Sequence, residues 1–176
     1  MTVTIDVTDQ DVFTAVRTVL LSFVPPNTPI QQGQANRVAM PASSMGFVLM
    51  TRLEQNKLAT NVHTYPQIAD PTTQWVTQSI EYKMQLDFYG AQSQQWALEA
   101  MMLFSDEYAC NLMPAHIQPL YVDNAMQLPL TNGEEQYEQR WKMVLAVQFN
   151  PTLTVTQDYA KILTAGIHEV DVTFKP

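Results

Sequence analysis

The histidines and the single cysteine are the residues best suited to metal binding or nucleophilic catalysis. His63, His116 and His168 lie far apart, and none belongs to an HxxxH pair or accompanies a CxxC pair. Metal sites usually show such spacing, so we expect none here. Cys110 precedes His116, and a cysteine–histidine pair is conceivable, but the spacing does not predict one. Because Cys110 follows an apolar helical stripe, we expect it to be a small buried side chain.

The other polar residues show no pattern typical of an enzyme. No serine lies in a G-x-S-x-G turn, and the five glycines stand singly, so no phosphate-binding loop is indicated. Two pairs of adjacent carboxylates occur, at 106–107 and 134–135. Adjacent residues on a helix do not face each other, and the second pair follows a turn signal, so neither indicates acid–base chemistry. We therefore expect no enzyme activity, no catalytic residue and no cofactor.

The sequence predicts two helices before residue 110. Apolar residues recur at helical spacing after a cap at Thr8 or Asp9, and this helix ends at Pro25 because proline cannot donate a helix hydrogen bond. A second apolar stripe predicts a helix from Ser93 to about Tyr108. Each stripe is typical of a helix that packs one side against a core.

Alternating apolar and polar residues predict the strands. The clearest alternation covers 76–88 and 137–149, which indicates a sheet with one buried face. We expect an α+β fold, a mainly antiparallel or mixed sheet with two or three helices packed on one face. The segments 1–9, 27–45 and 54–74 show little periodicity and are predicted as an N-terminal extension and two long loops. The remaining predicted elements are a strand from 47 to 53 or on to 57, strands over 117–122 and 167–174, and a short helix over 157–163.

Composition excludes several classes of protein. The chain has 176 residues, which predicts a single domain over 1–176. Hydrophobic residues make up 46% and charged residues 15%, which excludes intrinsic disorder. No apolar run is long enough for a transmembrane helix, and the polar, acidic first ten residues lead us to expect no secretory signal. A net charge of −8 disfavours a nucleic-acid-binding surface, and a single cysteine fits a reducing compartment.

Most of the polarity comes from uncharged side chains. The sequence contains 18 glutamines and 18 threonines. Exposed charge is a common means of keeping sheet edges apart, and the centres of interfaces are depleted in charge. The surface is therefore either an ordinary neutral one or one that contacts other subunits.

Several segments together resemble the neck terminator family of contractile-tailed bacteriophages. The resemblance runs from about residue 10 to the end and rests on the order and spacing of the segments. They are Gln32-Gly33-Gln34, Asn36-Arg37-Val38, Met40-Pro41, Leu58-Ala59-Thr60-Asn61-Val62, Gln85-Leu86-Asp87-Phe88-Tyr89-Gly90, Phe104-Ser105-Asp106-Glu107-Tyr108, Pro119-Leu120-Tyr121, the run from Gly133 to Trp141, and Val170-Asp171-Val172-Thr173-Phe174.

The resemblance implies a non-enzymatic virion protein of the tail or neck, assembled in the cytoplasm of a host bacterium. It implies a ring, of six copies, that caps the tail tube and joins it to the head-proximal connector or head-completion protein, with the sheath as a further partner. DNA would only pass through the channel, and no membrane is involved. The uncharged loops and the final predicted strand are the expected subunit interface: Gln32, Gln34, Asn36, Arg37, Asn61, His63, Tyr65, Val170, Val172 and Phe174.

Three other interpretations remain open. The chain could be another ring component of the neck or baseplate, which sequence separates poorly from a terminator. It could be a small-molecule-binding module or an enzyme with an apolar pocket lined by Trp75, Trp96, Trp141 or the methionines. Binding to DNA is disfavoured because 17 acidic residues outnumber nine basic ones.

Overall fold

The computed structural model describes residues 3–33, 41, 45–65, 73–131 and 137–156. The helices are α1 (Asp9–Leu20), α2 (Ser93–Phe104) and α3 (Glu107–Leu112). The strands are β1 (Val3–Ile5), β2 (Ile30–Gln32), β3 (Phe47–Lys57), β4 (Val62–Thr64), β5 (Thr73–Thr77), β6 (Ile80–Tyr89), β7 (Ile117–Val122), β8 (Met126–Thr131), β9 (Tyr137–Phe149) and β10 (Thr152–Thr156).

A six-stranded sheet forms the body of the molecule. Its order is β2-β3-β6-β9-β7, and β8 also pairs with β9. β2 runs parallel to β3, whereas every other pairing in this sheet is antiparallel. The long strand β9 carries β8 along its first half and β7 along its second half. The predicted mixed, mainly antiparallel sheet is therefore confirmed.

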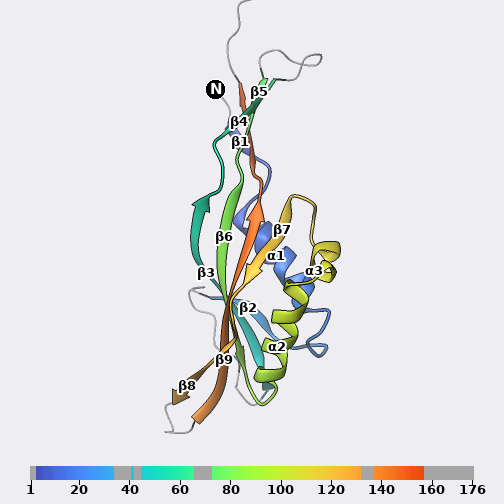
Figure 1. Cartoon of the computed structure of the whole chain (residues 1–176), viewed down its shortest axis with the longest axis vertical. Helices are drawn as coiled ribbons and strands as arrows, with labels where there is room; N and C mark the ends of the chain where they lie inside the picture. The colour runs from blue at the N-terminus through green and yellow to red at the C-terminus, as the bar shows by residue number, and fades with distance from the viewer. Residues whose placement is uncertain (1–2, 34–40, 42–44, 66–72, 132–136, 157–176) are drawn as a thin grey trace, which may run out of the picture.

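The three helices cover one face of this sheet (Figure 1). Tyr82, Met84, Leu86 and Phe88 alternate along β6 and are fully buried in the core beneath the helices. The other side of β6 carries Glu81, Lys83, Gln85 and Asp87, which is the period of two that the sequence predicted. Both the α+β class and the packing of the helices on one face are confirmed.

A second, four-stranded sheet extends from one end of the body (Figure 1). Its order is β1-β10-β5-β4, and all of its pairings are antiparallel. Three of its strands continue body strands, since β4 follows β3, β5 precedes β6 and β10 follows β9. We call these four strands the projecting sheet. The junction is held by a hydrogen bond from the Gln78 amide to the Pro151 carbonyl at 3.2 Å.

The segments predicted as an extension and as loops contain strands. β1 lies within 1–9, β2 within 27–45, and the end of β3, all of β4 and the first residues of β5 within 54–74. β8 and β10 were not predicted either. Apart from β3, these strands are short, with three to six residues each, so the brief alternation in β1 and β10 was too short to indicate a strand. Pairing with distant strands determines their conformation.

The second predicted helix is two helices. α2 ends at Phe104, and the Asp106 carboxylate accepts a hydrogen bond from the Tyr108 amide at 3.0 Å, which caps α3. An aspartate at the N-cap begins a new helix with a different axis, and the apolar stripe alone does not reveal this break. The helix predicted over 157–163 and the strand predicted over 167–174 lie outside the described residues.

Candidate subunit interface

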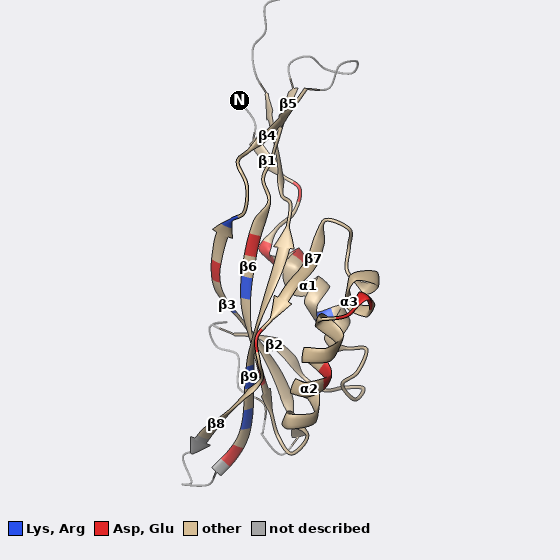
Figure 2. Ribbon diagram, in the orientation of Figure 1, with Lys and Arg blue, Asp and Glu red and all other residues tan. Residues whose placement is uncertain are grey.

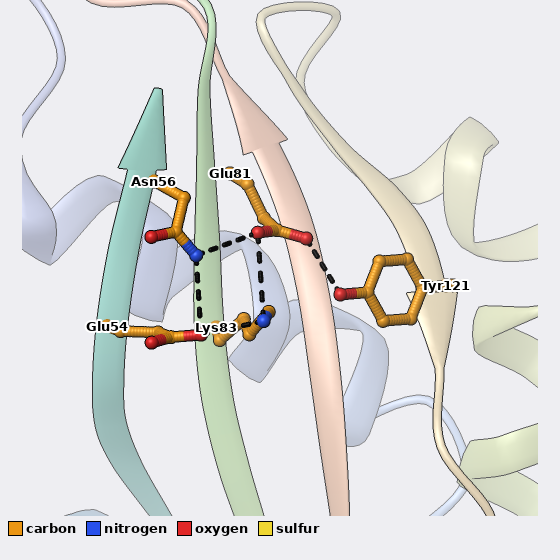
Figure 3. Close-up of polar contacts among 5 residues, drawn as sticks. All are labelled: Glu54, Asn56, Glu81, Lys83 and Tyr121. Atoms are coloured by element: carbon orange, nitrogen blue, oxygen red, sulfur yellow. Dashed lines mark hydrogen bonds and ion pairs between the residues drawn. The ribbon is translucent and has the colours of Figure 1, made fainter. Parts of the chain in front are cut away.

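A polar network lies on the face of the body sheet that the helices leave open (Figure 3). Lys83 Nζ lies 2.6 Å from Glu54 Oε1 and 3.8 Å from Glu81 Oε2. Asn56 donates to Glu81 at 3.0 Å, and the Tyr121 hydroxyl donates to its other oxygen at 2.7 Å. Each of these side chains therefore has a partner on another strand, and the bond from Tyr121 on β7 reaches β6 across β9.

The electrostatics of this network favour fixed charges over proton transfer. Hydrogen bonds from Asn56 and Tyr121 lower the pKa of Glu81, and the hydrogen bond from Lys83 lowers the pKa of Glu54. Glu54 in turn raises the pKa of Lys83. All three groups are thus charged near neutral pH, whereas an acid–base catalyst needs a pKa near the working pH. The network is suited to joining β3, β6 and β7.

Other chemistry is equally sparse in the described part of the chain. No group of three His, Cys, Asp or Glu side chains is placed to hold a metal ion there. Cys110 is exposed on α3, so the expectation of a buried thiol was wrong, because α3 turns away from the stripe of α2. Among the described helices, none is long and apolar enough to cross a membrane.

The projecting sheet has one apolar face. Residues directly opposite each other in paired strands lie on the same side of a sheet. The register aligns Ile5 with Leu153, Val76 and His63 across the four strands, and the next row aligns Val3 with Val155 and Gln74. None of these side chains is buried. We call the five aliphatic side chains the apolar face: Val3, Ile5, Val76, Leu153 and Val155.

The opposite face of the projecting sheet is rich in threonine. Thr4, Thr154 and Trp75 form one row, and Thr77 and Thr152 form the next, with their hydroxyl oxygens 3.0 Å apart. The four strands read VTI, VHT, TQWVT and TLTVT and contain no Lys, Arg, Asp or Glu, as can be followed in Figure 2. Both faces of this sheet are therefore uncharged and open.

A second apolar surface lies on the body, along α2. A cavity of about 350 Å³ opens between α2 and the strand β9. Leu98 and Met102 on α2 are exposed at this groove. We call this the α2 groove, which is lined by Gln94, Leu98, Met101, Asn124, Ala125 and Trp141. The described part of its lining contains no charged side chain.

The structure brings together some of the predicted interface residues. His63 and Tyr65 lie on the side of the apolar face, where the Gln74 amide is within hydrogen-bond distance of His63 Nδ1 and donates to the Tyr65 hydroxyl at 3.0 Å. Asn61 lies in the turn that leads into β4. Gln32 lies elsewhere, on β2, where it donates to Gln10 on α1 at 3.0 Å. Outside the described residues lie Gln34, Asn36, Arg37, Val170, Val172 and Phe174.

Sequence reasoning missed the apolar face, because Val3, Ile5, Leu153 and Val155 lie on strands predicted as loops or not at all. Val76 was placed in a single strand over 76–88, which the structure divides into β5 and β6 in different sheets. A usable signal was the absence of charge from segments rich in threonine and valine. Of the tryptophans and methionines suggested as the lining of an apolar pocket, Trp141 and Met101 do line one, the α2 groove, but the three tryptophans do not share it. Trp96 is buried in the core, Trp75 is exposed on the projecting sheet, and Trp141 lines the α2 groove.

Two comparisons with known proteins found a match, one with a family and one with a solved structure. The phage neck terminator protein family matches residues 10–174. No curated protein sequence matches this chain. Among solved structures, the chain is similar to the PVC sheath/tube terminator of an extracellular contractile injection system in its extended state, with a TM-score of 0.50 and 15% identity. The match covers 95% of this chain but 64% of that one, and at this identity it shows a shared fold. Since the family match spans nearly the whole sequence, the chain belongs to the phage neck terminator protein family.

Proposed function

We propose that this protein is a structural component of the virion that ends the tail at its head-proximal side. Copies of the chain form a ring, of six subunits, on the last ring of the tail tube. The ring joins the tube to the connector or head-completion protein, contacts the sheath and leaves a channel for DNA. Assembly takes place in the host bacterial cytoplasm. The observation that carries this proposal is the family match over residues 10–174.

The surface of the molecule supports an assembly role. A ring subunit needs two different surfaces, because each copy meets one neighbour on each side. The described residues offer two uncharged apolar surfaces, the apolar face and the α2 groove. By contrast, the polar groups of the open sheet face are bonded to one another. We therefore propose that the protein acts in assembly and not in catalysis.

The charge of the chain suits a channel through which DNA slides. A net charge of −8 repels phosphate groups, so a lining formed by acidic residues would let the genome pass without adhering. Mapping Asp and Glu onto a reconstruction of the assembled ring tests this point, and a basic channel would refute it.

A genetic test addresses the proposed function. In a phage whose copy of this gene carries a stop codon, we expect tails of irregular length that do not join heads. Purified protein added to such tails should restore joining. Tails of normal length that carry heads without this protein would overturn the proposal, and a defect confined to the baseplate would assign the chain to another ring of the particle.

The α2 groove favours one second candidate, a binding site for a small apolar molecule. Its volume of about 350 Å³ lies near the lower limit for ligand pockets, and Trp141 and Met101 line it. A ligand that binds the folded state raises the melting temperature. A broad thermal-shift screen without any stabilising compound would count against this function.

A further inference from the structure

We propose that the apolar face of the projecting sheet docks on the α2 groove of a second copy of this chain, so that copies associate head to tail. This inference rests on the proposed ring and adds to it which two surfaces meet. It commits to a partner, a second copy, and to the region of that copy that is contacted.

Among the described residues, no layer covers the apolar face. A sheet becomes stable by burying one face against another layer, and a small sheet open on both sides is marginal. Among the described residues of the projecting sheet, Val3 and Ile5 remain 58% and 51% exposed, and the helices cover only the body sheet. Five aliphatic side chains on one open face are therefore the part of the described surface that gains most from a partner.

The absence of charge points to a second copy as that partner. Two chains that each carry a net charge of −8 repel each other, and the repulsion is smallest where the touching surfaces are neutral. The projecting sheet contains no Lys, Arg, Asp or Glu, and neither does the described lining of the α2 groove. A basic partner would instead be recognised by an acidic surface, which these two surfaces do not provide.

We choose the α2 groove as the matching surface because its described lining is uncharged and exposed apolar side chains lie along it. Leu98 and Met102 are one helical turn apart on α2 and are 51% and 63% exposed. The groove lies on the body, whereas the apolar face lies on the projecting sheet (Figure 1). A contact between different surfaces is heterologous and continues around a ring, whereas two apolar faces packed on each other would stop at a dimer.

The size of the contact predicts weak association in solution. Four strands about 4.8 Å apart with about 3.3 Å per residue give a face of roughly 300 Å². Stable complexes bury about 800 Å² on each partner, so this contact alone is weak. It becomes effective when a ring closes or when copies gather on a tail end, because the later contacts are then intramolecular.

The test uses two variants of the full chain that each disable one surface. The sheet variant carries Ile5→Asp and Leu153→Asp, and the groove variant carries Leu98→Asp and Met102→Asp. A control variant carries Leu53→Asp and Leu120→Asp, two exposed leucines outside both surfaces, and so adds the same charge. All substituted side chains are exposed, and circular dichroism with thermal melting verifies that each variant folds.

Sedimentation velocity and light scattering over a wide range of concentration provide the readout. We expect the wild type and the control to associate as concentration rises. Each surface variant alone should associate at least about 100-fold more weakly, since two charged groups replace the apolar contact. A mixture of the sheet variant with the groove variant should form dimers that grow no further, because one intact face meets one intact groove.

Several results would overturn the inference. The wild type could stay monomeric at its highest soluble concentration, or either the sheet variant or the groove variant could associate as strongly as the control. The mixture of the two variants could also form no dimer. A sheet variant that associates normally but is missing from tails would show that the apolar face binds another tail component. The stop-codon phage tests the proposed function separately. If the wild-type protein restores tails but the sheet variant associates normally, only the proposed contact is refuted and the proposed function stands.

Discussion

The ion pair between Asp87 and Arg140 gives the sharpest prediction about stability. Asp87 lies on β6 with its side chain 1% exposed. Arg140 on β9 reaches one carboxylate oxygen with two nitrogens, Nε at 3.0 Å and Nη2 at 2.9 Å. Gln85 donates to the other oxygen at 2.7 Å. The guanidinium group also lies over the ring of Tyr89, 5.5 Å from its centre.

Replacing Arg140 with Met leaves a buried carboxylate with one hydrogen-bond donor. Removing one partner of a buried ion pair costs about 3–5 kcal/mol, because the remaining charge stays out of water. In a chain of this length, each kcal/mol lowers the melting temperature by about 2–4 °C, so we expect a fall of at least about 6 °C. The same loss should be measured as free energy of unfolding in urea.

Arg52→Met supplies the matched control. Arg52 pairs with Asp9 at 2.7 Å, but both side chains are largely exposed. An exposed pair contributes about 0–1 kcal/mol. The reasoning would be refuted if the two variants lost the same free energy of unfolding, since burial would then make no difference to the cost.

Three further results are expected. Gly46→Ala should destabilise the fold by about 1–3 kcal/mol in urea unfolding, because Gly46 has a φ of +66° and an added Cβ would lie 2.7 Å from the ring of Trp96; an unchanged midpoint would contradict this. Leu86→Ala should cost about 2–5 kcal/mol in the same assay by leaving a cavity beneath the helices, and a loss below 1 kcal/mol would contradict that placement. The pKa values of Glu54 and Glu81 are lowered in the folded protein, so the two ionised carboxylates stabilise the fold above their unfolded pKa values, and this stabilisation is lost as the pH falls through their folded pKa values. The free energy of unfolding should therefore depend less on pH in the acid range in Glu81→Gln. An identical pH profile would contradict the assigned hydrogen bonds.

Elements with one buried face could be predicted from the sequence. Tyr82, Met84, Leu86 and Phe88 alternate with polar residues because helices cover one side of β6 only. The stripe of α1 was recognisable for the same reason, since it packs on that core. In both cases the local pattern records the contact with the core, so the period identifies the element.

The projecting sheet could not be predicted in this way. β10 alternates, with Thr152 and Thr154 on one side and Leu153 on the other, but it has only five residues and directly follows the Asn150-Pro151 break, so the alternation was not recognised as a strand. Ile5 joins Leu153 through pairing of β1 with β10, at opposite ends of the sequence, and no local pattern records this register. His63 and Tyr65 were reached through the family resemblance, whereas the aliphatic part of the same face needed the strand register.

A cryo-EM reconstruction of the head-proximal end of the tail tests the central claim most directly. The account predicts a ring in which every subunit density fits this fold, between the last tube ring and the connector, with the projecting sheet of each copy on the α2 helix of its neighbour. A ring of a different fold at that position, with this chain located at the baseplate or absent from the particle, would contradict it.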